Sequence, residues 1–126
     1  MFVFRKEIDQ PVTWPVFIEM AQDGGKVKKV EFKGKFLRLN NEQRKKIDEE
    51  LDDISRKEGE DYIDAAVLRI SRFMVGWSDI VDEDNKPIEY SQEALREIAK
   101  GPVGMAFITA VTRAVTEIDA GIKAKN

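Results

Sequence analysis

Clustered carboxylates are the residues of this chain whose type and spacing come nearest to a site for chemistry. Asp82, Glu83 and Asp84 are consecutive, and Ca²⁺ and Mg²⁺ prefer such oxygen ligands. An EF-hand loop that began at Asp82 would need an oxygen ligand at its fifth position and glycine at its sixth, but the chain has Lys86 and Pro87 there. We therefore interpret this segment as a solvated turn and predict no metal site.

A second acidic group could supply the carboxylate pair that glycosidases use in acid–base catalysis. It comprises Glu58, Glu60, Asp61 and Asp64. Acidic residues are also common in the first turn of a helix, where they complement the helix dipole, and nothing nearby in the sequence indicates burial. The chain has no histidine and no cysteine, which removes the usual proton shuttle, thiolate nucleophile and zinc ligands. We expect no enzymatic activity and no cofactor.

A basic strand between residues 26 and 35 is the third candidate, because lysines interleaved with aromatic residues can bind single-stranded nucleic acid. Its lysines are Lys26, Lys28, Lys29, Lys33 and Lys35. The neighbouring Phe32 and Phe36 alternate onto the face opposite most of these lysines, and the net charge of -3 gives no long-range attraction to phosphate. A small nucleic-acid-binding regulatory protein therefore stays as the alternative function, and we do not favour it.

Length and composition define the setting of these residues. The 126 residues are expected to form a single domain, and 42% hydrophobic with 36% charged residues is typical of a soluble globular protein. No apolar run approaches the roughly 18 residues that span a bilayer. We expect a cytoplasmic protein with no membrane contact.

Residues 1–39 have mainly strand character. The even positions from Val12 to Met20 are all apolar, which is typical of a strand with one buried face. Pro15 predicts an edge strand or a bulge, because proline cannot donate a ladder hydrogen bond. The turn Asp23-Gly24-Gly25 leads into a second strand, in which the phase slips at Lys28-Lys29 and predicts a bulge.

A further strand is expected around Phe2 and Phe4, ahead of the hairpin.

Residues 40–122 have mainly helical periodicity. Asn40 or Asn41 can cap a first helix, whose thin apolar stripe predicts a surface position. Asp61 can cap a second helix with a broad apolar face that extends to Trp77. A connector or small hairpin over 78–90 leads to a third helix capped by Ser91, and a last helix runs from about Val103 to Ile122. The predicted class is α+β, with an N-terminal antiparallel hairpin or small sheet packed against three to four C-terminal helices.

The first half of the last helix is apolar nearly all round. A helix of this kind is either central to the core or covered by a partner. The sequence alone leaves both interpretations open.

The connector and its flanks carry a more specific pattern. Val75-Gly76-Trp77 is followed by Ile80-Val81-Asp82-Glu83-Asp84-Asn85-Lys86-Pro87-Ile88-Glu89-Tyr90-Ser91 and then Glu93-Ala94-Leu95. This segment resembles the tail assembly chaperones of long-tailed (siphovirus-type) bacteriophages or prophages. In that family a helix ends in Gly-Trp, an acidic hairpin ends in proline and a hydrophobic residue, and the next helix starts at a serine cap. Asn85 stands where the family more often has glycine, and asparagine can adopt the same positive φ.

The resemblance implies a non-catalytic protein that binds the tape measure protein, keeps it soluble and promotes tail tube assembly. It implies a location in the cytoplasm of the host bacterium, absence from the mature virion, self-association and a possible contact with the tail tube protein. The partner contacts that we predict on this basis are Met105, Phe107, Ile108 and Val111. The residues that we expect to shape the connector are Trp77, Asn85 and Pro87.

The family often makes a longer form by ribosomal frameshifting near the end of the short gene. Ala124-Lys125-Asn126 can be encoded by GCA AAA AAC, which contains the slippery heptamer A AAA AAC. Our hypothesis is that this chain is the short, zero-frame product.

Overall fold

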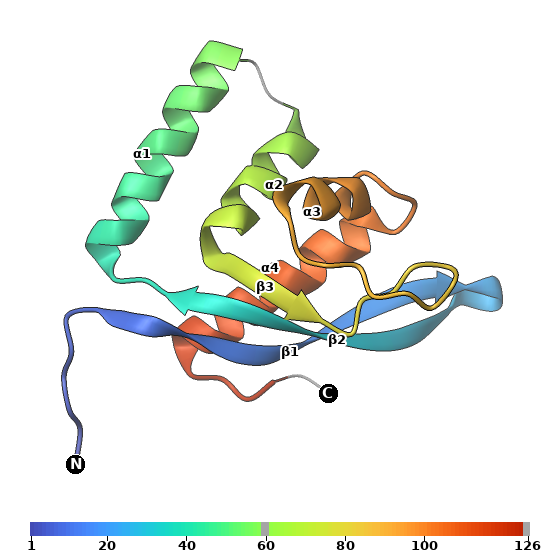
Figure 1. Ribbon diagram of the computed structural model, residues 1–126, viewed down its shortest axis with the longest axis horizontal. Helices are drawn as coiled ribbons and strands as arrows, with labels where there is room; N and C mark the ends of the chain where they lie inside the picture. Colours follow the sequence, from blue (N-terminus) through green and yellow to red (C-terminus); the bar gives the residue numbers. More distant parts are fainter. Residues whose placement is uncertain (59–60, 125–126) are drawn as a thin grey trace.

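The computed structural model describes residues 1–58 and 61–124 of the chain. The elements, in chain order, are β1 (Ile8–Gln22), the 3-10 turn η1 (Asp23–Gly25), β2 (Lys26–Arg38), α1 (Asn41–Glu58), α2 (Tyr62–Phe73), β3 (Met74–Ser78), α3 (Gln92–Ala99) and α4 (Gly104–Ala120). The three strands form an antiparallel sheet in the order β1-β2-β3 (Figure 1). The predicted α+β class, a small antiparallel sheet packed against helices, is confirmed.

The long β1–β2 hairpin forms as the alternation predicted. Val16 and Ile18 of β1 face the helices with Phe32 and Phe36 of β2, and all four side chains are buried. Glu31, Lys33 and Lys35, which alternate with these residues in β2, are exposed, so the helices cover one face of the sheet and leave the other open. β1 is an edge strand, as Pro15 requires.

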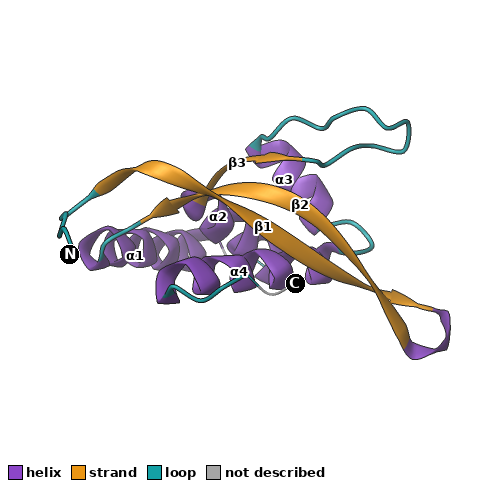
Figure 2. Cartoon of the chain, turned by 90° about the horizontal axis from the view of Figure 1, so that it is seen from below, coloured by secondary structure: helices purple, strands orange, loops and turns teal. Residues whose placement is uncertain are grey.

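The bulge expected at Lys28-Lys29 is absent, and that prediction is wrong. Met20 pairs with Lys28 and Glu19 pairs with Lys29 without interruption. The break in apolar phase has another cause: the end of the hairpin extends past the helices, so Lys28 occupies a helix-facing position with no helix over it (Figure 2). The register shifts lie elsewhere, between Ile8 and Val12 in β1 and beside Phe36 in β2.

The third strand is also not where the sequence placed it. Phe2 and Phe4 lie outside the sheet and are largely exposed. The third strand is instead β3, within the segment predicted to be the end of a helix. Ile70, Phe73 and Trp77 are spaced as on a helical face, and five residues are too few for strand alternation to stand out.

A row of aromatic side chains crosses the sheet at Gly34. This glycine pairs with Trp14 on one side and Trp77 on the other. A Cβ atom on Gly34 would lie 2.6 Å from the Phe36 ring, so the missing side chain makes room for that ring. Gly34 thus allows three large aromatic side chains to share one layer of the sheet.

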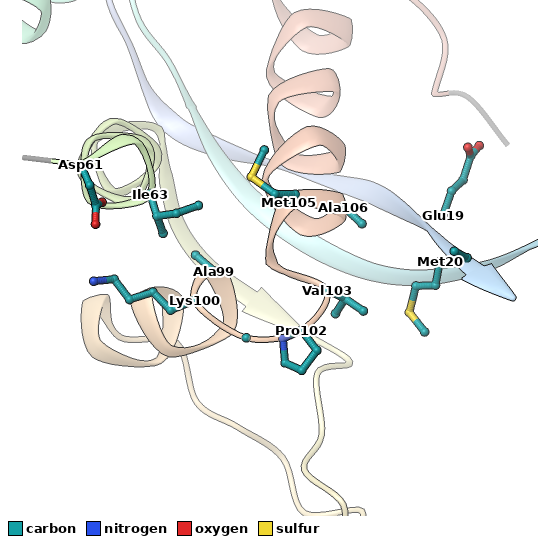
Figure 3. Close-up of a pocket in the computed structure, with 12 residues that line it drawn as sticks. Glu19, Met20, Asp61, Ile63, Ala99, Lys100, Pro102, Val103, Met105 and Ala106 are labelled. Carbon is teal, nitrogen blue, oxygen red and sulfur yellow. The ribbon is translucent and has the colours of Figure 1, made fainter.

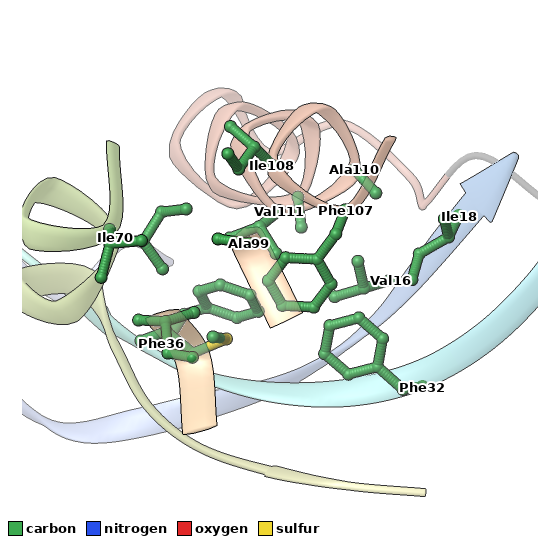
Figure 4. Close-up of a cluster of buried hydrophobic side chains, with 14 residues drawn as sticks. Val16, Ile18, Phe32, Phe36, Ile70, Ala99, Phe107, Ile108, Ala110 and Val111 are labelled. Atoms are coloured by element: carbon green, nitrogen blue, oxygen red, sulfur yellow. The ribbon is translucent and has the colours of Figure 1, made fainter. Parts of the chain in front are cut away.

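Helix α4 completes the core by packing across the buried face of β1 and β2 (Figure 4). The rings of Phe32 and Phe107 are stacked with their centroids 5.5 Å apart. Val111 and Ala114 lie one and two turns further along the same face and are almost fully buried. These contacts join the sheet to the last helix.

The helix caps agree with the sequence. The Asn40 side chain accepts from the Gln43 amide at 2.8 Å and the Gln43 side chain accepts from the Asn40 amide, which makes a reciprocal capping box for α1. The side chains of Asp61 and Ser91 accept from backbone amides in the first turns of α2 and α3.

Helix α1 is a surface helix, as expected. Leu51 is buried but lies outside the main core cluster. Ion pairs attach the described part of the helix to its neighbours, among them Arg69 with Asp48 at 2.8 Å, Arg72 with Glu50, and Arg44 with Asp119 at 2.5 Å.

Replacing Gly104 with alanine is predicted to destabilise the fold. A Cβ atom there would lie 1.8 Å from the Ala99 carbonyl oxygen, so α3 and α4 would have to separate. We expect the free energy of unfolding, measured by urea denaturation, to fall by about 3 kcal/mol. Gly76→Ala is the control, because its nearest neighbour is the flexible Lys35 side chain at 3.5 Å. Equal stability of the two variants would contradict the close helix contact.

Candidate partner-binding surface

The structure separates the four predicted partner contacts. Phe107, Ile108 and Val111 are buried, with exposed fractions of 1%, 4% and 0%, whereas Met105 is 52% exposed. The side chains of the first three residues therefore fill the core of the folded chain, and only Met105 is exposed to a partner; contact of these residues with a partner stays a prediction.

Helix geometry explains the division. Successive residues of an α-helix are separated by about 100°, so Met105 projects on the side opposite Phe107. The first half of α4 is apolar all round, and sequence periodicity could not select the buried face. The stacking of Phe107 on Phe32 selects it and leaves Met105 at the surface.

Met105 lies at a hollow of about 750 Å³ at the end of the molecule where α4 begins (Figure 3). Its wall includes Met20 of β1, Ile63 of α2, and Val103 and Ala106 beside Met105. We call this the terminal hollow. Of the predicted partner residues, only Met105 contributes to this hollow. The other residues of its wall could not be found from the sequence, because they come from separate elements that only folding brings together.

A smaller hollow of about 300 Å³ lies next to the connector and also has Val103 in its wall. We call it the connector hollow. Ile18 and Val30 of the hairpin line it together with Ile80 and Ile88 of the connector. Val103, which is 42% exposed, therefore separates two apolar depressions beside one hairpin.

A third depression of about 400 Å³ lies between α2 and α4. Its lining includes Ile108 and Val111 together with Tyr62, Ile70 and Phe73. Two of the predicted partner residues thus contribute to the floor of a groove, although little of their surface is open.

The connector residues Trp77, Asn85 and Pro87 have structural positions. The Trp77 indole N–H donates to the Ile88 carbonyl oxygen at 2.7 Å. Its ring packs edge-on against Tyr90, with centroids 4.9 Å apart. Asn85 has a φ of 62°, and Pro87 forms a β-bridge with Val81. The connector is a tight hairpin that Trp77 helps to anchor to the sheet.

Part of the charge near the terminal hollow is compensated. Asp64 forms ion pairs with Arg96 and Lys100, each at 3.0 Å. The hydrogen bond from Lys100, together with the positive charges of both partners, holds the pKa of Asp64 below its ordinary value of 3.8. Lys100, which also lines the hollow, therefore faces an acidic neighbour rather than adding an unbalanced positive charge.

Of the acidic residues considered above, Asp61, Asp64 and Asp82 have structural roles. The Asp82 side chain accepts from the amides of Asp84 and Lys86, at 2.8 and 3.0 Å, and so stabilises the connector turn. Glu60 lies outside the described residues. Within residues 1–58 and 61–124, no group of three acidic residues is arranged to hold a metal ion. In the same ranges, no helix has the length and apolar character needed to cross a bilayer.

The lysines of β2 divide between the two faces of the hairpin. Lys29, Lys33 and Lys35 lie on the open face of the sheet, opposite the buried Phe32 and Phe36, as alternation predicted. Lys26 and Lys28 lie on the helix-facing side, where they pair with Gln22 and Met20. The basic strand is therefore two separate groups of charge.

Comparison with known proteins gives no relative: no protein-family model, curated protein or solved structure matches the chain. The frameshift hypothesis stays a prediction about the gene, and an AAG codon for Lys125 would contradict it. Lys125 and Asn126 lie outside the described residues.

Tyr90→Phe is predicted to loosen the connector. The Tyr90 hydroxyl donates to the Met74 carbonyl oxygen at 2.6 Å, and its loss is expected to lower the free energy of unfolding by about 1 kcal/mol in urea denaturation. Tyr62→Phe is the control, because Tyr62 is 66% exposed.

The same bond has a pH dependence. Burial raises the pKa of Tyr90 above its ordinary value of 10.0, so the folded state favours the neutral phenol. The contribution of Tyr90 to the free energy of unfolding is therefore fully present below pH 10, and it is lost as the pH rises through the raised pKa of the folded state. Tyr90→Phe should lessen this alkaline loss, and an unchanged pH profile would contradict the assignment.

Proposed function

We propose that this protein is a tail assembly chaperone of a long-tailed bacteriophage or prophage, and that it binds the tape measure protein and keeps it soluble. The observation that carries the proposal is the pair of apolar hollows beside Val103, with Met105 exposed at the terminal hollow. A tape measure protein has long apolar helical stripes, and an apolar depression can cover part of such a stripe.

The connector supplies the second support. The residues that carry the family resemblance form one packed unit, in which Trp77 contacts Tyr90 and bonds to Ile88. Ile88 also lines the connector hollow. The connector residues that resemble the chaperone family would thus hold Ile88 in place in the wall of the connector hollow.

The proposal includes the setting in which such a chaperone acts. The protein works in the cytoplasm of the host bacterium, promotes tail tube assembly and is absent from the mature virion. Coating a long partner favours self-association of the chaperone, and a contact with the tail tube protein is a further part of the proposal.

One observation favours the alternative, a nucleic-acid-binding regulator. Phe17 lies on the open face of the sheet, and the Lys29 amino group is 5.7 Å from its ring centroid. Glu19 and Glu31 lie on the same face, however, and pair with Lys29 and Phe17 across the hairpin. These carboxylates would repel phosphate, so we rank this function second.

Met105→Asp is predicted to abolish the chaperone effect. The long helical protein encoded immediately downstream is co-expressed with the wild-type chain or the variant, and its soluble fraction and co-purification are measured. Aspartate in the first turn of α4 is compatible with folding because it complements the helix dipole, but it places charge in the terminal hollow. We expect at least a tenfold loss of co-purified partner.

Thr116→Asp is the matched control, because Thr116 is exposed on the same helix and lies away from the hollows described above. It should retain wild-type behaviour. If the wild-type chain leaves the long protein insoluble, or if the pair dissociates at high salt as a phosphate complex would, the proposed function fails.

A further inference from the structure

Two lysines stand at the end of the apolar side of the hairpin. Along β1 and β2, the helix-facing pairs are Ile18 with Val30, then Met20 with Lys28, then Gln22 with Lys26. The first pair is packed against the core, and Met20 lies in the wall of the terminal hollow. One continuous surface therefore changes from apolar to basic toward the hairpin tip.

These two charges are not compensated as Lys100 is. Among the described residues, neither Lys26 nor Lys28 has an ion pair, and both are exposed. The other charges at the tip are Asp23 in the turn and Glu19 and Lys29, which are register partners across the hairpin; Glu19 also lines the terminal hollow. The helix-facing side of the tip is thus locally positive, although the chain has a net charge of -3.

We propose that the terminal hollow and the hairpin tip together bind an amphipathic helix whose apolar face ends in acidic residues. The inference rests on the proposed function in taking a helical partner, and it adds the charge that this partner must carry. The apolar face would cover Met20, Val103 and Met105, and the acidic end would meet Lys26 and Lys28.

A helix fits this surface because the walls present side chains. Met20, Ile63, Val103 and Met105 form the apolar part of the wall and offer side-chain contacts to an occupant. An α-helix satisfies its own backbone hydrogen bonds and can offer apolar side chains at i, i+3, i+4 and i+7. Positive charge at one end also sets the direction in which the helix lies.

The test uses two synthetic helical peptides with the same apolar stripe, one with glutamates and one with lysines beside its end. Binding to the full chain is measured by fluorescence anisotropy at low and high salt. We expect the acidic peptide to bind about tenfold more tightly at low salt, with the difference falling as salt screens the charges.

The double variant Lys26→Glu with Lys28→Glu should reverse this preference. Lys33→Glu with Lys35→Glu is the matched control, because it makes the same charge change in the same strand on the open face. The control should keep the preference for the acidic peptide.

Equal binding of both peptides, or an equal effect of the two double variants, would contradict the role of Lys26 and Lys28 in binding an acidic helix end. The apolar part of the proposed site would not be affected by that result. Binding of neither peptide would overturn the inference as a whole, while co-purification of the long downstream protein decides the proposed function separately. Salt-sensitive binding of a single-stranded oligonucleotide that only the control variant loses would instead favour the open face and the alternative function.

Discussion

The stacking of Phe107 on Phe32 is the interaction on which the other surfaces of the molecule depend. It fixes the rotation of α4 about its axis, because a helix with apolar residues all round could otherwise pack by several faces. With Phe107 and Val111 turned to the sheet, Met105 must face outward. The position of Trp77 follows from the same contact, since its ring packs edge-on against both phenylalanines.

The unequal lengths of the strands and helices produce the binding surface that we propose. The β1–β2 hairpin continues past the helices (Figure 2), and its helix-facing side changes from the buried Phe32 to the partly buried Met20 and the exposed Lys28 toward the tip. The α3–α4 turn ends beside it, with Gly104 packed directly on the Ala99 carbonyl. The terminal hollow forms because the helices do not fully cover this apolar strand face and because the α3–α4 turn lies close beside it.

Features encoded within a few residues were predictable from the sequence, and features decided by long-range packing were not. The caps at Asn40, Asp61 and Ser91 and the hairpin turn depend on local chemistry and were correctly placed. β3 was missed because it becomes a strand only by pairing with β2. The burial of Ile108 and the exposure of Met105 depend on the sheet, so periodicity within α4 could not separate them. The terminal hollow joins distant segments, and no sequence motif marks it.

Helix α1 is attached in a way that sets it apart from the rest of the fold. Its contacts include the buried Leu51, ion pairs such as Arg44 with Asp119, and the Arg44 guanidinium over the Phe73 ring. None of its residues whose side chains are described belongs to the main core cluster. Surface ion pairs contribute little free energy each. The amide protons of α1 should therefore exchange with solvent through local opening of this helix, at a lower free energy than the amides of α4, which exchange only with global unfolding.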